Sequence, residues 1–401
     1  MKAVHTSNDH FVKTLKWLMI FAGFWKMPLS KNPFLNKLYM FYSKGSKIYM
    51  FLFIILLAME LFRLIKDQEN SKVIITSFCV MVSCILIAVK LYIIIKRNLA
   101  DLIQEIIIKE EEIWKSDDEE VKDIFTRKAY FCNVLCAGLT MVQVVCLASM
   151  SAMAFIGDQE LIEYNRVHNT TLDTYYWYQL WFPGVKLDHL GWVYTLNGCF
   201  GWIACSNSMV CHSLLATLMI FASTKMEILC AILRKCVKGK IDVDLDRNIF
   251  ELKRCVVEHQ DIIEYVTRLN KSISLILLLH FLLNSVEISS CVTSYLKGSV
   301  PMLQQIFLAS YVTLTVYQIL MASWNANEIQ HQSTKIADAF YEINWLLLNK
   351  DGKTICLISA HRAQKPLSTT LGPFGAMTNQ SGLLVIKAAY SYVSVMNTGT
   401  L

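Results

Sequence analysis

The sequence predicts an all-α membrane protein with seven transmembrane helices, and three observations support this prediction. Of the 401 residues, 54% are hydrophobic and only 17% are charged, whereas soluble domains carry about 25% charged residues. The mean hydropathy of +0.40 is high for a soluble protein. The third observation is a series of apolar runs, each long enough to cross a bilayer, which takes roughly 18 or more residues.

Seven apolar runs predict seven membrane spans. The first two, at about 47–65 and 73–95, are rich in isoleucine, leucine and phenylalanine. The fourth, at about 192–222, is more polar but contains no Asp, Glu, Lys or Arg. The seventh, at about 380–398, is the least apolar of the set. The other three spans are predicted at about 129–156, 272–296 and 303–324.

The lysine and arginine residues predict which side of the membrane each loop occupies. Basic residues are held on the cytoplasmic side in short loops. Segments on one side of the predicted bundle contain 30 of the 38 Lys and Arg residues, against six on the other side. This bias places the N-terminus in the cytoplasm and the C-terminus outside, which is an inverted topology relative to G-protein-coupled receptors. Asn169, in an Asn-Thr-Thr sequon of a predicted outer loop, is a candidate glycosylation site.

The spans and the charge bias divide the chain into six segments. They are a cytoplasmic N-terminus with an interfacial helix (1–46), transmembrane helices one to four (47–222) with an extracellular loop (157–191), a cytoplasmic helical extension (223–271), transmembrane helices five and six (272–324), a cytoplasmic anchor segment (325–379) and a seventh transmembrane helix (380–401). In the first segment, Trp17, Phe21 and Trp25 recur at helical spacing. This spacing favours a helix in the plane of the membrane, with the three aromatic rings facing lipid.

Helical periodicity continues beyond the predicted membrane boundaries. Between Asp246 and Lys271, one helical face carries the apolar residues Ile249, Leu252, Val256, Ile263 and Val266. After the sixth span, Ile336, Phe340, Ile343 and Leu347 form a second such face. These faces predict amphipathic helices that project into the cytosol and bury their apolar sides. Packing within one chain and packing between neighbouring subunits both satisfy the pattern.

The sequence contains no recognisable catalytic, cofactor or metal motif. It has no HExxH, GxGxxG or P-loop pattern, and none of its thirteen cysteines lies clearly in an outer loop, so no disulfide framework is indicated. The acidic runs at 109–112 and 117–120 are interpreted as solvated helix faces or loops. We therefore expect no enzymatic activity, no cofactor, no metal and no nucleic-acid partner.

A few polar residues lie within the predicted spans. His212, His280, Asn284 and Glu287 are such residues, and polar groups in a membrane are costly and often functional. Hydrogen bonds between helices are the favoured interpretation for each. Lys90, near the cytoplasmic end of the second span, is expected to extend its ammonium group to the membrane surface.

Three stretches in the C-terminal third resemble the most characteristic region of insect odorant receptors. They are ADAFYEINWLLLN (Ala337–Asn349), AHRAQKPLSTTLGPFGAMT (Ala360–Thr378) and IKAAYSYVSVMNT (Ile386–Thr398). The stretches His259–Asn270 and Tyr175–Trp192 are similar to that family as well. The resemblance covers essentially the whole chain, and it is more specific in the C-terminal third than in the first half.

The resemblance implies a subunit of a ligand-gated, non-selective cation channel in the plasma membrane of a sensory neuron. Members of the family assemble as tetramers with a shared odorant receptor co-receptor. Each subunit binds a volatile small molecule in the outer half of its helix bundle, and the last half-helix lines one central pore. The cytoplasmic helices form an anchor domain with most of the subunit contacts. The implied partners are the co-receptor, the ligand and membrane lipid, and no G protein is required.

A site for a volatile ligand is expected to be apolar with a few orienting groups. Methionine and aromatic side chains suit deformable apolar binding, and spans two, three, four and six carry such residues in their predicted outer halves. The candidates are Phe78, Met81, Val82, Cys146, Met150, Met153, Tyr194, Asn197, Phe200, Phe307 and Tyr311. Ordinary helix packing is the alternative explanation for each of them.

The resemblance also implies roles for the last helix. Alignment of YSYVSVMNT with the family pattern places Val395 at a hydrophobic constriction, and Thr398, with Asn397 close by, at a polar ring. Ser391 and Ser394 would face water or a neighbouring helix. A hydrophobic ring gates by dewetting, and the lack of an acidic residue in this stretch agrees with weak selectivity among cations. The same composition would suit a helix that does not conduct.

Three other classes of protein are alternatives to this hypothesis. A G-protein-coupled receptor would have its N-terminus outside the cell. A transporter with broken helices would show Gly or Pro interruptions in two related halves, whereas all six prolines here fall in predicted loops. An insect gustatory receptor, a related channel of similar topology, is the alternative that remains.

Overall fold

The structure is a computed structural model that describes residues 10–68, 71–168, 179–184, 186–237, 245–296 and 302–398. These residues form ten α-helices and three short 3-10 helices. The α-helices are α1 (Lys13–Ala22), α2 (Pro33–Lys66), α3 (Ser71–Lys96), α4 (Leu99–Lys115), α5 (Glu119–His168), α6 (Leu190–Cys236), α7 (Leu245–Leu296), α8 (Met302–Glu342), α9 (Lys350–Ala363) and α10 (Asn379–Thr398). The 3-10 helices are η1 (Lys186–His189), η2 (Trp345–Leu347) and η3 (Gly372–Phe374).

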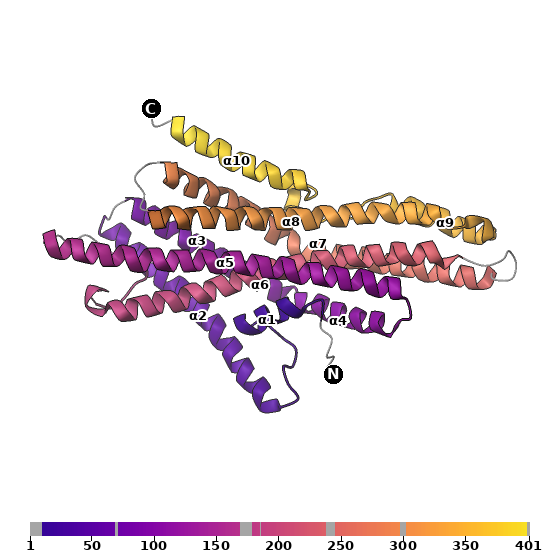
Figure 1. Cartoon of the computed structure of the whole chain (residues 1–401), viewed down its shortest axis with the longest axis horizontal. Helices are drawn as coiled ribbons and strands as arrows, with labels where there is room; N and C mark the ends of the chain where they lie inside the picture. Colours follow the sequence, from indigo (N-terminus) through magenta and orange to yellow (C-terminus); the bar gives the residue numbers. More distant parts are fainter. Residues whose placement is uncertain are drawn as a thin grey trace.

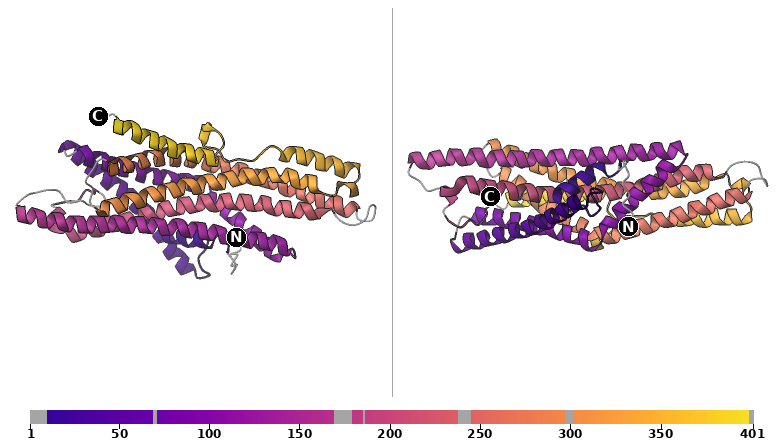
Figure 2. Two further views of the ribbon diagram at one scale, coloured as in Figure 1. Left: turned by 45° about the horizontal axis from the view of Figure 1, so that its top comes forward. Right: turned by 90° about the horizontal axis from the view of Figure 1, so that it is seen from below.

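The longest helices run side by side along the long axis of the molecule, as Figures 1 and 2 show. Among the described residues, six helices are long and apolar enough to cross a membrane, namely α2, α3, α5, α6, α7 and α8. The most apolar window of α6 is 89% buried, against 28% for that of α3, so α6 is the central helix. The predicted all-α membrane fold is confirmed.

The predicted seventh span corresponds to α10, a 20-residue helix. It is not one of the six helices above. One face of α10 packs against α7 and α8, with Gly382, Ala389 and Val393 buried. In Figure 1, α10 lies at the edge of the bundle beside α8. Its role as a membrane span stays a prediction.

Two helices extend well beyond the thickness of a membrane. At 1.5 Å per residue, the 52 residues of α7 span about 78 Å, whereas the hydrocarbon core of a bilayer is about 30 Å thick. Of the predicted apolar faces, Leu252 and Val266 of α7 and Ile336 and Phe340 of α8 are at most 2% exposed. Ile249, Val256 and Ile263 of α7 are half-buried. A single chain therefore buries part of each predicted face, and the position of these segments relative to a membrane stays a prediction.

His259 of α7 lies in this extension, outside the predicted membrane segment, and it gives the stability a pH dependence. The side chain is buried, with its ring 6.1 Å from that of Phe340. Burial, together with the positive charge of Arg362, lowers the pKa of His259 to about 4. The unfolded chain takes up this proton at a pKa of about 6.5. Below pH 6.5 the unfolded state therefore binds more protons, and the stabilisation is lost as the pH falls towards 4.

We expect the melting temperature of the purified protein in detergent to fall between pH 7 and pH 5 in part because of His259. A His259→Gln variant removes the titrating group, so its melting temperature should fall less over the same range. Thermal unfolding followed by tryptophan fluorescence measures both. Equal decreases in the two proteins would show that His259 is not responsible.

The N-terminal segment folds back into the bundle instead of lying wholly on its surface. Phe11 is buried against the rings of Phe125 and Phe221, at centroid distances of 5.2 and 5.6 Å. In α1, Trp17 and Phe21 are exposed as predicted. The prediction for Trp25 is wrong, because α1 ends at Ala22 and the chain turns at Gly23, where φ is +81°. Trp25 follows this turn and is buried.

The acidic run at 109–112 is not simply a solvated face, as the sequence had indicated. The carboxylate of Glu110 is buried and accepts hydrogen bonds from the backbone N–H groups of His10 and Phe11, at 2.8 and 3.3 Å. Burial raises the pKa of the Glu110 carboxyl. The neighbouring Lys109 bonds to Glu258 of α7 at 3.0 Å. This stretch therefore connects the N-terminal segment and the first half of α7 to α4.

Candidate ligand site and pore helix

One group of predicted ligand-binding residues forms an aromatic stack between α2, α3 and α6. The ring of Phe200 lies between Tyr49 and Phe53, with centroids 4.1 and 4.9 Å away and the ring planes within 17° of parallel. Met81 of α3 packs against this cluster, and Leu180 is a buried member of it. Stacked rings and a methionine give an apolar, deformable surface of the kind that suits a small volatile molecule.

A second group lies between α5 and α8. Cys146 is buried, and the half-buried rings of Phe307 and Tyr311 are 5.9 Å apart. The hydroxyls of Ser149 and Ser310 are 3.1 Å apart and join the same two helices. Apolar side chains with a few hydroxyl groups are typical of a site that binds and orients a small ligand.

The carboxylate of Glu287, in α7, contacts residues of both α3 and α8. The hydroxyl of Ser83 donates a hydrogen bond of 2.7 Å to Oε1 of Glu287, and Glu287 is also close enough to Tyr311 to interact with it. The predicted hydrogen bond between helices is therefore confirmed for Glu287. Because a carboxylate accepts several hydrogen bonds, this group has the capacity to orient a ligand that carries a donor.

The remaining predicted ligand residues are dispersed. Phe78 is 52% exposed, and Val82, Met150 and Met153 are half-buried. Tyr194 lies 6.0 Å from Phe155 in an edge-to-face arrangement. The amide of Asn197 is buried and donates to the carbonyl of Val193 at 3.0 Å. The structure therefore gathers the predicted residues into two clusters and leaves several of them outside both.

Two hollows lined by described residues lie away from these clusters. One, of about 440 Å³, runs along α9 between Leu348 and Leu357. The other, of about 20 Å³, lies between α1, α3 and α6 and is lined by Met19, Lys26 and Leu91, among others.

A polar cluster in the spans involves α3, α6 and α7. The rings of His212 and His280 are 4.5 Å apart, and the amide of Asn284 lies 3.1 Å from Nε2 of His280. The expectation that Lys90 reaches the membrane surface is wrong, since this side chain is only 6% exposed and is buried within the bundle. Its charge is near enough to Glu287 to interact with it, so a half-buried carboxylate lies within electrostatic reach of a buried ammonium.

The free face of α10 is mixed in character. Leu383, Leu384 and Tyr390 are exposed apolar residues, while Lys387, Ser391 and Ser394 follow one another at helical spacing and are exposed as well. The hydroxyl of Ser391 donates to the carbonyl of Lys387 at 3.0 Å. Val395, Asn397 and Thr398 belong to the last turn of α10, but their side chains lie outside the described part of the structure, as does the whole of Asn169.

Both α10 and the segment that precedes it contact α7. Asn270 of α7 accepts hydrogen bonds from the backbone N–H and the hydroxyl of Thr370, at 2.8 and 3.1 Å. Farther along, the hydroxyl of Ser289 of α7 donates to the carbonyl of Ser285 at 2.6 Å and also lies 3.3 Å from the carbonyl oxygen of Ala389 of α10. Ser289 and Ala389 are both buried, so the helix that carries Glu287 is in direct contact with α10.

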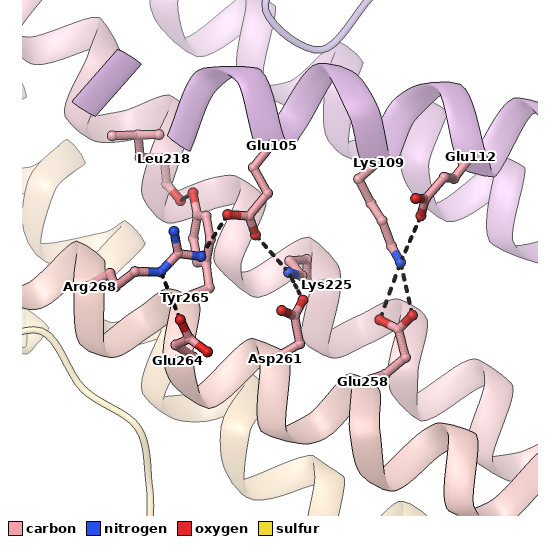
Figure 3. Close-up of polar contacts among 10 residues, drawn as sticks. All are labelled: Glu105, Lys109, Glu112, Leu218, Lys225, Glu258, Asp261, Glu264, Tyr265 and Arg268. Atoms are coloured by element: carbon pink, nitrogen blue, oxygen red, sulfur yellow. Dashed lines mark hydrogen bonds and ion pairs between the residues drawn. The ribbon is translucent and has the colours of Figure 1, made fainter. Parts of the chain in front are cut away.

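Ion pairs connect α4, α6 and α7 just outside the predicted spans (Figure 3). Nζ of Lys225 lies 3.1 Å from Glu105 and 2.7 Å from Asp261, and Arg268 lies 2.8 Å from the other carboxylate oxygen of Glu105. The Lys225 side chain is only 4% exposed, and its ammonium group is 5.1 Å from the centre of the Tyr265 ring. The attraction between these opposite charges fixes the positions of α4, α6 and α7 relative to one another.

Some residues of these clusters lie outside the predicted ligand set. Tyr49 and Phe53 come from α2, whose aromatic pair at a spacing of four residues is a signal visible in the sequence. In the sequence, Glu287 stands out only as a polar residue within a span, and it is not among the predicted ligand residues. Leu180 precedes α6 in a connecting segment, and nothing in the local sequence marks it as part of the aromatic cluster.

The chain matches a family model described as 7tm Odorant receptor over residues 70–390. It is 31% identical to Odorant receptor 10 of Aedes albopictus over 144 residues and 31% identical to Odorant receptor Or2 of Anopheles gambiae over 147 residues. These matches cover 36% of this chain and 38% of each relative. Odorant receptor 46a, isoform B, of Drosophila melanogaster is 19% identical over 97% of this chain and 98% of its own.

A solved structure shares the fold over nearly its whole length. The insect olfactory receptor OR5 from Machilis hrabei, in complex with eugenol, superposes with a TM-score of 0.75 and 14% sequence identity. The match covers 98% of this chain and 100% of that one. At this level of identity, the likeness establishes the arrangement of helices.

Proposed function

This chain belongs to the insect odorant receptor family, and we propose that it is a subunit of a ligand-gated, non-selective cation channel. The single observation that carries the proposal is the double connection of α7. In this helix, Glu287 is near enough to the predicted ligand residue Tyr311 to interact with it, and Ser289 contacts the carbonyl of Ala389 in α10. A ligand that changes the packing around Glu287 therefore acts on the helix that we assign to the pore.

We infer that the ligand is a volatile molecule with an apolar body and one hydrogen-bond donor. Phe200, Tyr49 and Met81 supply apolar surface, and the Glu287 carboxylate accepts a bond from a hydroxyl or amine. Eugenol, in complex with the Machilis hrabei receptor, has such a hydroxyl. Tyr311, which is near enough to Glu287 to interact with it, would complete the site in this chain together with the adjacent ring of Phe307.

The proposed channel function also implies how the subunit assembles and how it is oriented in the membrane. The subunit would join the odorant receptor co-receptor in a tetramer in the plasma membrane of a sensory neuron, with the N-terminus in the cytoplasm and Asn169 outside. Ser391 and Ser394 would line the water-filled part of the pore. Val395 would form its hydrophobic constriction, with Asn397 and Thr398 at the polar outer end. The exposed polar row on α10 supports this arrangement.

The test is electrical recording from cells that express the full chain together with the co-receptor. We expect odorant-evoked cation currents that persist when G proteins are inhibited. In a Glu287→Gln variant, the half-maximal concentration for hydroxyl-bearing ligands should rise about tenfold, because a charge-assisted hydrogen bond becomes a neutral one. Glu264→Gln, on the exposed cytoplasmic part of the same helix, is the matched control and should leave the response unchanged.

Two outcomes would contradict the proposal. Silence across a broad panel of volatiles, with the protein present at the cell surface, would refute the channel function. Accessibility of a tag at Met1 on intact cells would refute the orientation and favour a G-protein-coupled receptor. An unchanged response of Glu287→Gln to hydroxyl-bearing ligands, with currents intact, would instead refute only the assignment of Glu287.

A further inference from the structure

Residues 13–48 form a lysine-rich elbow, made of α1, the segment that links it to α2, and the first half of α2. The elbow contains seven lysines and no aspartate or glutamate. Six of the lysines are exposed, and Lys16 is half-buried. A stretch with this composition carries a strong positive potential that no side chain of its own offsets.

The two arms of the elbow are joined by side-chain hydrogen bonds. Carbonyl groups at the end of α1 accept from hydroxyls of α2: Ser43 donates to Gly23 at 2.6 Å, Ser46 to Ala22 at 3.1 Å, and Tyr39 to Met19 at 3.3 Å. These bonds replace the partners that the last carbonyls of a helix lack. The lysines of the two arms therefore occupy a defined arrangement.

The exposed apolar side chains of the elbow lie beside its lysines. Phe34, Leu38, Phe41 and Ile48 recur on one face of α2 and are 57% to 78% exposed. Lys37 and Lys44, also exposed, flank this face at one edge. In Figure 1 the beginning of α2 projects away from the main bundle, so the bundle does not cover this face. An apolar stripe bordered by lysines is typical of a helix at the surface of a membrane.

Two lysines come together at the inner corner of the elbow. Lys26 and Lys47 are close enough for their charges to act on each other, and the Lys47 ammonium lies 5.6 Å from the centre of the Phe24 ring. Neither makes an ion pair with an acidic group among the described residues. Because like charges repel, this corner is electrostatically complementary to an external anion.

We propose that the elbow binds the headgroup of an anionic phospholipid, with the phosphate between Lys26 and Lys47. The apolar stripe of α2 would lie among the acyl chains, which places the two ammonium groups at the depth of the lipid phosphates. Charge complementarity and the adjoining apolar face together identify a lipid, since a soluble anion makes no use of the stripe. The leaflet follows from the proposed orientation and is the cytoplasmic one, where anionic lipids are concentrated.

The test is a lipid titration of the full chain purified in detergent, with the melting temperature as the measurement. We expect dioleoylphosphatidylserine to raise the melting temperature, and dioleoylphosphatidylcholine to have a much smaller effect. A Lys26→Gln/Lys47→Gln variant should need about 30-fold more phosphatidylserine for the same shift. The Lys26→Arg/Lys47→Arg variant keeps both charges and should respond like the wild type.

A matched control carries the same two substitutions far from the elbow, at the exposed Lys253 and Lys350, and should also respond like the wild type. An equal loss in this control would overturn the proposal, because it would show only a general effect of net charge. A shift of the same size with inorganic phosphate would overturn it in favour of a soluble anion. Single variants, Lys26→Gln and Lys47→Gln, each with an intermediate loss, replace the double variant if it does not elute as a single folded species.

Discussion

Replacement of Lys225 by methionine is expected to destabilise the protein by about 3 kcal/mol. The substitution removes a charge that is 4% exposed and leaves Glu105 and Asp261 facing each other. It also removes the cation–π contact with Tyr265, at 5.1 Å. Since Glu105 and Asp261 are 25% and 51% exposed, water offsets part of their repulsion, which places the effect at the lower end of the range for buried pairs.

A loss of this size is a large part of the 5–15 kcal/mol that stabilises a typical protein. The measurement is thermal unfolding in detergent, together with the fraction of protein that elutes as a single species. Lys253→Met, at an exposed position of α7, is the control and should change little. Equal stabilities of Lys225→Met and the wild type would mean that the network in Figure 3 contributes nothing to folding.

Replacement of Gly382 by alanine is expected to weaken the contact between α10 and α8. A Cβ atom at this position would lie 3.0 Å from Cβ of Ser323 and 3.5 Å from a methyl group of Ile319, and it would also collide with the Ser323 hydroxyl. Overpacking of this kind costs about 1–3 kcal/mol. Because α10 is the proposed pore helix, both the melting temperature and the ligand-evoked current should fall.

Two further variants isolate this contact. Gly45→Ala lies in α2, where a new Cβ meets no atom within 4 Å, so it measures the gain in helix propensity alone, which is about 1 kcal/mol. Ser323→Gly removes both atoms that the new methyl group would strike, and the double variant Gly382→Ala/Ser323→Gly should regain much of the lost current. If it regains none, the defect does not arise at this contact.

The periodic part of the sequence was a good guide to the fold. Apolar residues at steps of three and four predicted the buried faces of α7 and α8, because this spacing directly reports which side of a helix is covered. The lateral neighbours of each helix could not be predicted in the same way. Phe200 was chosen as an apolar residue of its span, but its stacking partners come from α2, and only the packed structure brings these helices together.

Local composition was misleading where distant segments meet. Glu110 belongs to an acidic run that is typical of a solvated surface, yet it bonds to the backbone at His10 and Phe11, about a hundred residues earlier in the chain. Trp25 continued a helical pattern of aromatic residues until the turn at Gly23 directed it inward. The residues next to Glu110 and Trp25 do not indicate that these side chains are buried. Their burial depends on where the N-terminal segment packs against the bundle.

The unbroken length of α7 has a mechanical consequence. A rod of about 78 Å that tilts by about 1° moves one end by about 1.4 Å relative to the other. The ion pairs of Glu258 with Lys109 and of Asp261 with Lys225 hold this rod towards one end, while Glu287 and Ser289 lie near the other. These ion pairs thus serve as a fulcrum, and their strength determines how far a small force at the proposed ligand site displaces the helix beside it.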